Sequence, residues 1–311
     1  APPAVPAPIA TVDAGDFRAL TVSANGRWMM VADAATDRLR IYDIENETPV
    51  LVASPTLDGT PVDAVSIGQA AIVAVDTGGR AGLAQIVAPI AYDPAQPFAP
   101  VNWIDLADRP RSVSASPDGT WAIVVGSSGY TVFEIGSLEE VTSTFYATPI
   151  ADAALLPDVA FLADRNTAQI LTVALGSGAQ ATLDRSLSIP LDAPAQHLAL
   201  NLSGTLGAAA LSNGAITLFD PQSGEVLSTF EAGAAADVYF LSFERGDWLV
   251  ILAADRGRIL LYDVSTPSDA LPLPDLDLPS GTSTIQAITT FGDLIFAADR
   301  STVRIWRAAQ P

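Results

Sequence analysis

The chain has 311 residues, and its composition, 49% apolar and 16% charged, excludes intrinsic disorder. The chain has 35 acidic and 15 basic residues, and all 15 basic residues are arginine. The resulting net charge of −20 repels nucleic acid and anionic membranes. Cysteine is absent, which excludes disulfides, thiolate metal sites and cysteine nucleophiles. A single histidine, His197, excludes a multi-histidine zinc site.

The chain opens with the sequence APPAVPAP, residues 1–8. We expect these residues to form a Pro/Ala-rich tail, left as the mature end after removal of a signal peptide. This expectation places the protein outside the cytoplasm, either secreted or at the cell surface. No run of 18 apolar residues occurs, so membrane insertion is not expected.

Short apolar runs rich in Val, Ile, Leu and aromatic residues make up most of the chain and predict short β-strands. They recur as one unit: a strand, a Gly turn, a strand that commonly ends in Asp, a short turn, a third strand that often closes on an aromatic and an acidic residue, and a looser outer strand. Seven copies occur, the second and fourth of them weaker, at residues 19–44, 63–87, 112–135, 151–173, 198–220, 238–264 and 285–306.

The third strands give the period of this repeat. Their equivalent positions follow one another at intervals of 40 to 47 residues, at Tyr42, Ile86, Phe133, Val173, Phe219, Tyr262 and Trp306. A four-stranded propeller blade repeats about every 40–45 residues. We therefore predict an all-β protein with a single domain over residues 9–311, a seven-bladed β-propeller with four-stranded blades.

Both ends of the repeat fit one closed ring. The seventh unit leaves no room for an outer strand, whereas residues 9–12 (IATV) provide a spare strand before the first unit. Pairing this strand with the last blade would cover two free strand edges. The pairs Asn25-Gly26, Asp118-Gly119 and Ser203-Gly204 provide the positive φ angles of tight hairpins. The proline-rich segments 89–100 and 267–279 are expected as loops on the outer rim.

These units resemble the WD-repeat β-propellers and their bacterial surface-protein relatives. The matching pieces are SPDGTW at residues 116–121 and the pairs YD, FE, FD and YD that close third strands. The Gly-His pair of that family is missing from every unit and the closing Trp-Asp never occurs, so its histidine hydrogen-bond network is not expected here. The resemblance implies a propeller with a binding role, and it implies no catalytic residue.

An aspartate ends the second strand in five units, and an arginine often follows it. The capping interpretation is that these carboxylates accept backbone N–H bonds in the turn. The alternative is a binding face on which the carboxylates hold a cation or a basic partner and the arginines recognise carboxylates. The candidate residues are Asp33, Asp76, Asp164, Asp255, Asp299, Arg165, Arg256 and Arg300.

Further candidates lie at the starts of inner strands and in two loops. Trp103, within PVNWIDL, is expected as an exposed contact, whereas Trp28, Trp121 and Trp248 share a position typical of packing between blades. Asp275 and Asp277 have an Asp-x-Asp spacing, which is a weak indication of a Ca²⁺-binding site. The residues expected at the mouth of a central channel are Asp63, Arg111, His197 and Asp237.

We expect a non-enzymatic interaction or assembly module, an extracytoplasmic scaffold that is part of a surface layer, a filament or a larger complex. Its partner would be another protein or copies of itself, with no nucleic acid, no cofactor and at most a cation on an acidic face. The alternative is a propeller hydrolase or lactonase with a metal ion in the central channel, held by Asp63, His197 and Asp237. The sequence contains no GxSxG and no phosphate-binding loop.

Overall fold

The computed structural model describes most of the chain and shows strands without helices in that part. The described residues are 8–13, 15–46, 48–68, 70–79, 81–87, 100–135, 139–145, 149–176, 180–243, 246–255, 257–278 and 284–308. Most of the predicted tail and of the predicted rim loop 89–100 lies outside them. Within these ranges the chain contains no helix able to cross a membrane.

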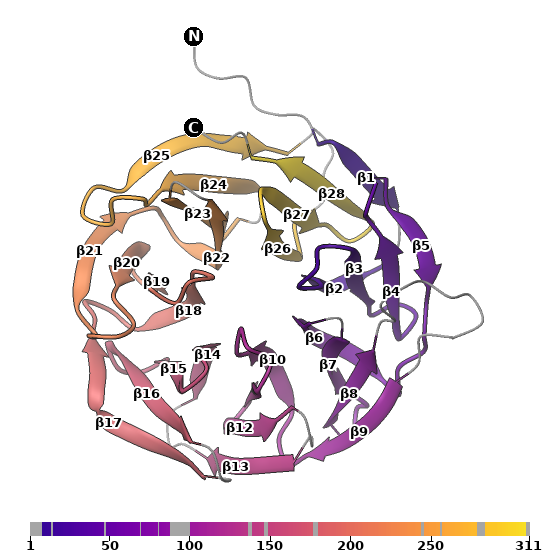
Figure 1. Ribbon diagram of the computed structural model, residues 1–311, viewed down its shortest axis with the longest axis horizontal. Coiled ribbons are helices and arrows are strands. Elements are labelled where there is room, and N and C mark those ends of the chain that lie inside the picture. The colour runs from indigo at the N-terminus through magenta and orange to yellow at the C-terminus, as the bar shows by residue number, and fades with distance from the viewer. Residues whose placement is uncertain are drawn as a thin grey trace. The chain divides into compact units, whose positions relative to one another are not determined.

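The predicted fold class, an all-β propeller, is confirmed. Strands β1 to β28 form seven four-stranded sheets, in which each strand is hydrogen-bonded to its antiparallel neighbour (Figure 1). Two compact units divide the chain: a terminal unit, made of Pro6–Ala115 and Ser283–Ala309, and a middle unit, Ser116–Thr282.

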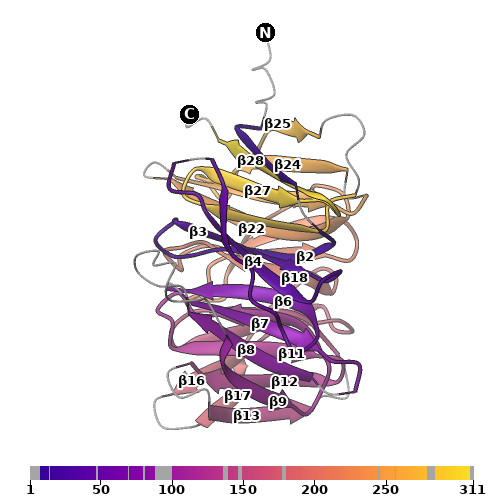
Figure 2. The same ribbon diagram turned by 90° about the vertical axis from the view of Figure 1, so that its right-hand side faces the viewer.

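The terminal unit contains three complete sheets. Figure 2 shows β6, β7 and β8 side by side in one of them. The first sheet consists of β2 (Phe17–Val22), β3 (Trp28–Asp33), β4 (Arg38–Asp43) and β5 (Val50–Ala53). The second consists of β6 (Thr60–Ile67), β7 (Ala70–Asp76), β8 (Ala81–Val87) and β9 (Pro100–Leu106). The last has the order β1 (Ala10–Asp13), β28 (Thr302–Arg307), β27 (Leu294–Ala298) and β26 (Ala287–Phe291).

The remaining sheets follow the order of the sequence. One consists of β10 (Pro110–Ala115), β11 (Trp121–Gly126), β12 (Gly129–Glu134) and β13 (Glu139–Phe145). The next consists of β14 (Ile150–Leu155), β15 (Val159–Asp164), β16 (Gln169–Gly176) and β17 (Gln180–Pro190). The last two are β18 (Ala195–Leu200), β19 (Gly207–Leu211), β20 (Ala215–Phe219) and β21 (Val226–Glu231), and β22 (Ala235–Phe243), β23 (Gly246–Ala253), β24 (Arg258–Asp263) and β25 (Leu271–Asp277).

The strand predicted at residues 9–12 is present as β1 and pairs with β28. The antiparallel register joins Ala10 to Ile305 and Val12 to Val303, and the Ile9 N–H donates to the Ile305 carbonyl at 2.7 Å. The last sheet of the chain thus takes its outer strand from residues that precede the first sheet.

The hairpin turns have the predicted conformation. Gly26, Gly119 and Gly204 have φ angles of 70°, 73° and 68°, which glycine adopts without the penalty of a side chain. In the first of these turns the Ser23 hydroxyl donates to Asn25 Oδ1 at 2.6 Å and accepts the N–H of Trp28 at 2.9 Å. A polar side chain therefore closes the turn where the backbone alone would leave N–H groups unpaired.

The core lies between neighbouring sheets, which explains the continuous apolar second strands. Along β3, Trp28 and Met30 pack into one cluster with Val73 of β7, whereas Met29 packs on the other face with Phe296 of β27. Successive strand residues point to opposite faces, so a strand with sheets on both sides is apolar throughout. Trp28, Trp121 and Trp248 are buried, as predicted from their shared position.

One loop prediction is wrong. The segment 267–279, expected as a rim loop because of its prolines, contains β25, which pairs with β24 and joins Arg258 to Asp277 in register. β25 is the outer strand of its sheet, and an edge strand tolerates proline because its outward N–H groups need no ladder partner.

Candidate functional site

The aspartates at the ends of the second strands all cap the following turn. Each carboxylate accepts the N–H of the residue two positions later, at 2.8 to 3.1 Å; the acceptors are Asp33, Asp76, Asp164, Asp255 and Asp299. Three of them, Asp33, Asp164 and Asp299, are buried. Their contacts support the capping interpretation, because a buried carboxylate with backbone donors is not part of a surface ring of charge.

Two of these buried carboxylates also pair with an arginine that sequence analysis missed. Arg40 Nη2 lies 2.7 Å from Asp33 Oδ2, and Arg304 Nη1 lies 2.8 Å from Asp299 Oδ2. Burial opposes the charge of Asp33 and Asp299, but hydrogen bonds from neighbouring side chains and backbone outweigh it and lower the pKa of both carboxyls. The shared motif Arg-Ile-aromatic in the third strand is the signal that could have identified these arginines.

The arginines of the predicted Asp-Arg pairs lie elsewhere. Arg300 is exposed beside its buried neighbour Asp299, and Arg165 is half-buried. Arg256 lies outside the described residues. The buried aspartates Asp33 and Asp299 therefore form their ion pairs with arginines that the strand register places beside them, and not with an arginine that follows them directly in the sequence.

Five inner strands, β2, β6, β14, β18 and β22, have a register shift of the β-bulge type near their start, and in three of them an aspartate lies at the shift. Asp63 Oδ1 accepts the N–H of Ala64, and its Oδ2 accepts the N–H of Val113 in β10, both at 2.8 Å. Asp152 repeats this arrangement in the middle unit, with Ala153 N–H at 2.8 Å and Leu198 N–H of β18 at 3.0 Å. Each carboxylate thereby links the inner strands of two sheets.

Asp152 was not among the residues predicted at the channel mouth. The signal was present, because Asp63-Ala64, Asp152-Ala153 and Asp237-Val238 are the same acidic-apolar pair at the same place in three units. Of the other residues predicted at the channel mouth, Arg111 is exposed at the start of β10.

Asp152, His197 and Asp237 come from β14, β18 and β22, neighbouring inner strands of the middle unit (Figure 1). His197 Nδ1 lies 3.8 Å from Asp237 Oδ1. Asp237 also accepts the N–H of Val238 at 2.9 Å and the hydroxyl of Tyr239 at 2.8 Å. The structure thus brings two predicted residues, His197 and Asp237, together with the missed Asp152.

The two carboxyls of this cluster are harder to ionise than usual. Burial raises the pKa of Asp237 to about 6, assisted by the negative charge of Asp152 and opposed by His197 and the two hydrogen bonds. Burial likewise raises the pKa of Asp152 against the opposing effects of His197 and the backbone N–H groups. The Asp237 side chain keeps 31% exposure, so water screens part of this effect.

Replacing Asp237 by asparagine is expected to stabilise the protein at neutral pH. A carboxyl whose pKa is about 6 when folded and 3.8 when unfolded makes the folded state lose stability as the pH rises from about 4 to 6. Asp237→Asn removes this loss, so its free energy of unfolding should exceed the wild-type value at pH 7 by about 1–2 kcal/mol, after allowance for screening.

Urea unfolding at pH 4 and pH 7 measures this difference. At pH 4 the stabilisation should vanish, since the wild-type carboxyl is then protonated. Asp192→Asn, at an exposed position, is the matched control and should show no pH-dependent gain. A variant less stable than wild type at pH 7 would show that Asp237 is stabilising as a charged group.

The remaining predicted residues give no separate site. Trp103 is half-buried and not an exposed contact: it packs against the core cluster of Trp28 and Val73, and its indole lies over Gly82. Its Nε1–H donates to Asp105 at 3.1 Å.

Asp275 is half-buried on β25, and the side chain of Asp277 lies outside the described residues. Where side chains are described, no group of three or more acidic or histidine residues is placed to hold a metal ion.

Exposed large apolar side chains gather on the outer strands. Among the described residues, five of six belong to an outermost strand or the residue directly before one: Ile9, Val50, Leu51, Val226 and Leu271. The sixth, Leu202, lies in a hairpin turn. Each of these strands, β1, β5, β21 and β25, has one edge without a partner in its own sheet.

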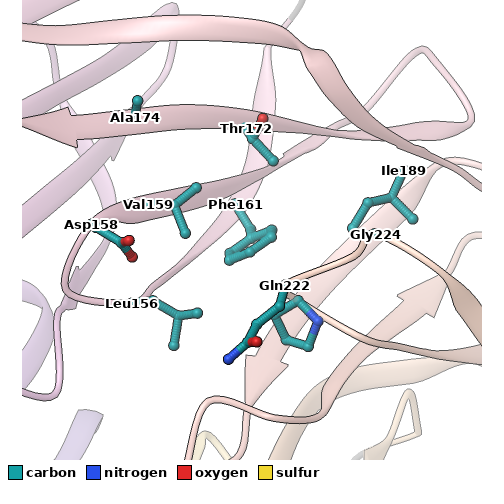
Figure 3. Close-up of a pocket in the computed structure, with 10 residues that line it drawn as sticks. Leu156, Asp158, Val159, Phe161, Thr172, Ala174, Ile189, Gln222 and Gly224 are labelled. Atoms are coloured by element: carbon teal, nitrogen blue, oxygen red, sulfur yellow. The ribbon is translucent and has the colours of Figure 1, made fainter.

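Two grooves of similar construction lie between sheets, one in each unit. The groove of the middle unit has a volume of about 400 Å³, and the β14–β15 turn and the β20–β21 turn form its walls (Figure 3). The groove of the terminal unit has about 500 Å³ and lies between the β26–β27 turn and the turns of the first sheet.

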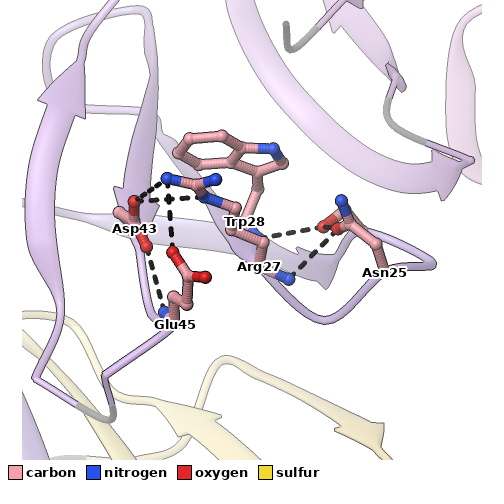
Figure 4. Close-up of polar contacts among 6 residues, drawn as sticks. Asn25, Arg27, Trp28, Asp43 and Glu45 are labelled. Carbon is pink, nitrogen blue, oxygen red and sulfur yellow. Dashed lines mark hydrogen bonds and ion pairs between the residues drawn. The ribbon is translucent and has the colours of Figure 1, made fainter. Parts of the chain in front are cut away.

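The groove of the terminal unit is rich in internal ion pairs. Arg27 Nη2 lies 2.9 Å from Asp43 Oδ2 and 3.4 Å from Glu45 Oε2, and its guanidinium lies 4.7 Å from the ring centre of Trp28 (Figure 4). Arg27 N–H also donates to Asn25 Oδ1 at 3.1 Å. Acidic side chains of this groove are thus neutralised by arginines of the same unit.

Comparison with known proteins does not place the chain in a family. No protein-family model matches it, and neither does any curated protein.

Proposed function

We propose that this chain is a non-enzymatic interaction module, an extracytoplasmic propeller scaffold whose partner is another protein or further copies of the chain. The observation that carries this proposal is the gathering of exposed apolar side chains on free strand edges. Unpaired edges of this kind bind a further strand through backbone hydrogen bonds, and apolar side chains on them add the hydrophobic contact.

β5 is the best candidate for the contact. Val50 and Leu51 are adjacent and 57% and 49% exposed, and the outer edge of β5 is free within its sheet. A charged residue on an edge strand is a common means of preventing edge-to-edge association. Replacing Val50 and Leu51 by lysine therefore tests whether the free edge of β5 mediates association.

Assembly of the chain with its own copies is expected to depend on β5. The wild-type mass, measured by light scattering during size-exclusion chromatography, should rise above that of a monomer with concentration, at a salt concentration that screens the net charge of −20. The double variant Val50→Lys, Leu51→Lys should remain a monomer at concentrations at least tenfold higher.

Leu202→Lys is the matched control, because Leu202 is more exposed, at 78%, but lies in a turn. It should assemble as the wild type does. A wild-type chain that is monomeric at every concentration would contradict assembly with its own copies, and equal effects of the two sets of substitutions would contradict the role of the outer strands.

We further propose that the seven sheets are the seven blades of one closed ring. The number of four-stranded sheets and the place of β1 beside β28 support this arrangement. Closure by β1 predicts a large loss of stability when that strand is removed.

The alternative hydrolase or lactonase has less support. Both carboxylate oxygens of Asp63 and of Asp152 accept backbone N–H groups, which gives these residues a role in joining inner strands. Carboxylates engaged in this way have less capacity to bind a metal ion or to take up a proton from a substrate.

A further inference from the structure

We propose that the groove of the middle unit binds an arginine side chain of a partner protein, with Asp158 as the residue that pairs with the guanidinium. The proposal concerns a different surface from the outer strands and does not depend on them. It follows from a comparison of this groove with its counterpart in the terminal unit, where an arginine of the chain itself occupies the equivalent position.

The two grooves are equivalent in their backbone. Asp158 lies in the β14–β15 turn and Asp293 in the β26–β27 turn, in the sequences LPDV and FGDL. The Asp158 carbonyl accepts the N–H of Leu175, and the Asp293 carbonyl accepts the N–H of Ala308, both at 2.8 Å. The two aspartates therefore have the same relation to the third strand of their sheets.

The packing of the two turns agrees with this equivalence. Leu156, two residues before Asp158, lies against Gly204 in the hairpin turn of the next sheet. Phe291, two residues before Asp293, lies against Gly26 in the same way. In each groove, a large apolar side chain of the lining therefore packs against a glycine in the hairpin turn of the neighbouring sheet.

The grooves differ in one position of the third strand. Leu294 pairs with Arg307, and Arg307 Nε lies 3.2 Å from Asp293 Oδ2. In the middle unit, Val159 pairs with Ala174, and both residues line the groove. The arginine that neutralises Asp293 is therefore replaced by alanine beside Asp158.

Asp158 is exposed, and no side chain in the described part of the chain makes a hydrogen bond or ion pair with its carboxylate. Figure 3 shows it at one end of the groove, with Val159, Phe161 and Ile189 along the groove and Gln222 opposite. The aliphatic stem of an arginine suits these apolar walls, and its guanidinium suits a carboxylate together with an amide oxygen. The strongly acidic chain as a whole also favours a basic partner.

N-acetyl-arginine methylamide is the probe for this site. We expect saturable shifts of the backbone amide signals of Leu156, Asp158, Val159 and residues 222–224 in two-dimensional NMR spectra. Affinity should be at least tenfold weaker for N-acetyl-citrulline methylamide, the neutral analogue. Asp158→Asn should weaken binding of the arginine probe about tenfold, since it removes a charge-assisted hydrogen bond.

Ala174→Arg provides the second variant. It places in this groove the arginine that the terminal unit already has, and it should abolish binding by occupying the site from within. Asp192→Asn, an exposed aspartate of the same unit that does not line the groove, is the control and should bind as the wild type does. All these substitutions are at exposed positions, so thermal unfolding should confirm that each variant is folded.

The proposal is overturned if the wild type shows no saturable shifts at Leu156, Asp158 and Val159, if the citrulline probe binds equally well, or if Asp158→Asn keeps wild-type affinity. Because the probe is a single side chain, these results are independent of whether the outer strands bind a protein.

Discussion

Replacing Asp33 by alanine is expected to lower the free energy of unfolding by about 3–5 kcal/mol, the usual cost of removing one partner from a buried ion pair. The carboxylate is fully buried and accepts N–H groups of Asp16 and Ala35, the hydroxyl of Thr36, and two N–H groups of Arg40. Alanine would leave all these donors without their acceptor and the Arg40 charge without its partner.

This effect should depend on pH in a known direction. The pKa of Asp33 is lowered on folding, so the stability that its charge contributes is complete above the ordinary value of 3.8 and is lost as the pH falls through the lower, folded value. The difference between wild type and Asp33→Ala, measured by urea unfolding, should therefore be full at pH 5 to 7 and shrink below pH 4.

Asp255→Ala is the matched control. Asp255 makes the same capping bond, to the N–H of Gly257, but its side chain is 61% exposed and its pair with Arg258 is 3.7 Å long. An exposed cap and ion pair contribute about 1 kcal/mol or less. Equal losses in the two variants would show that burial and Arg40 add nothing to the turn cap.

Deleting residues 1–13 is expected to destabilise the protein by about 4 kcal/mol or more, from the loss of the buried Val12 side chain and of the ladder hydrogen bonds to β28. The deletion also removes the cross-strand neighbours of Val303 and Ile305, which are buried in the same core cluster as Phe296. The new free edge of β28 should make the shortened chain prone to association.

Urea unfolding and light scattering measure the two effects of this deletion. A deletion of residues 1–7 keeps β1 and is the control, with an unfolding midpoint expected to match that of the full chain. Wild-type stability after removal of β1 would contradict the proposed closure of a ring by this strand.

The periodicity of the sequence was enough to predict the sheets, because a strand buried on both faces has to be apolar throughout and its turns need glycine. The prolines of residues 267–279 misled the prediction, since proline marks an edge strand as readily as a loop. β25 is such a strand.

The site was harder to predict because its contacts depend on register and on which sheets face each other. Arg40 and Arg304 lie on the strand after the aspartates that they neutralise, and only the ladder shows that they meet. Asp158 and Ala174 are separated by 16 residues and have no motif of their own. Their significance comes from comparison with Asp293 and Arg307, whose relation is visible only in three dimensions.

The pairing of β1 with β28 has a consequence for biosynthesis. β1 precedes the other strands in the sequence and its hydrogen-bonding partner β28 follows them, so Val12 stays without its ladder partner Val303 until β28 has been translated. Earlier sheets can form as they emerge, but the final sheet cannot. During that interval a nascent chain carries an unsatisfied strand that a chaperone or a neighbouring polypeptide can capture.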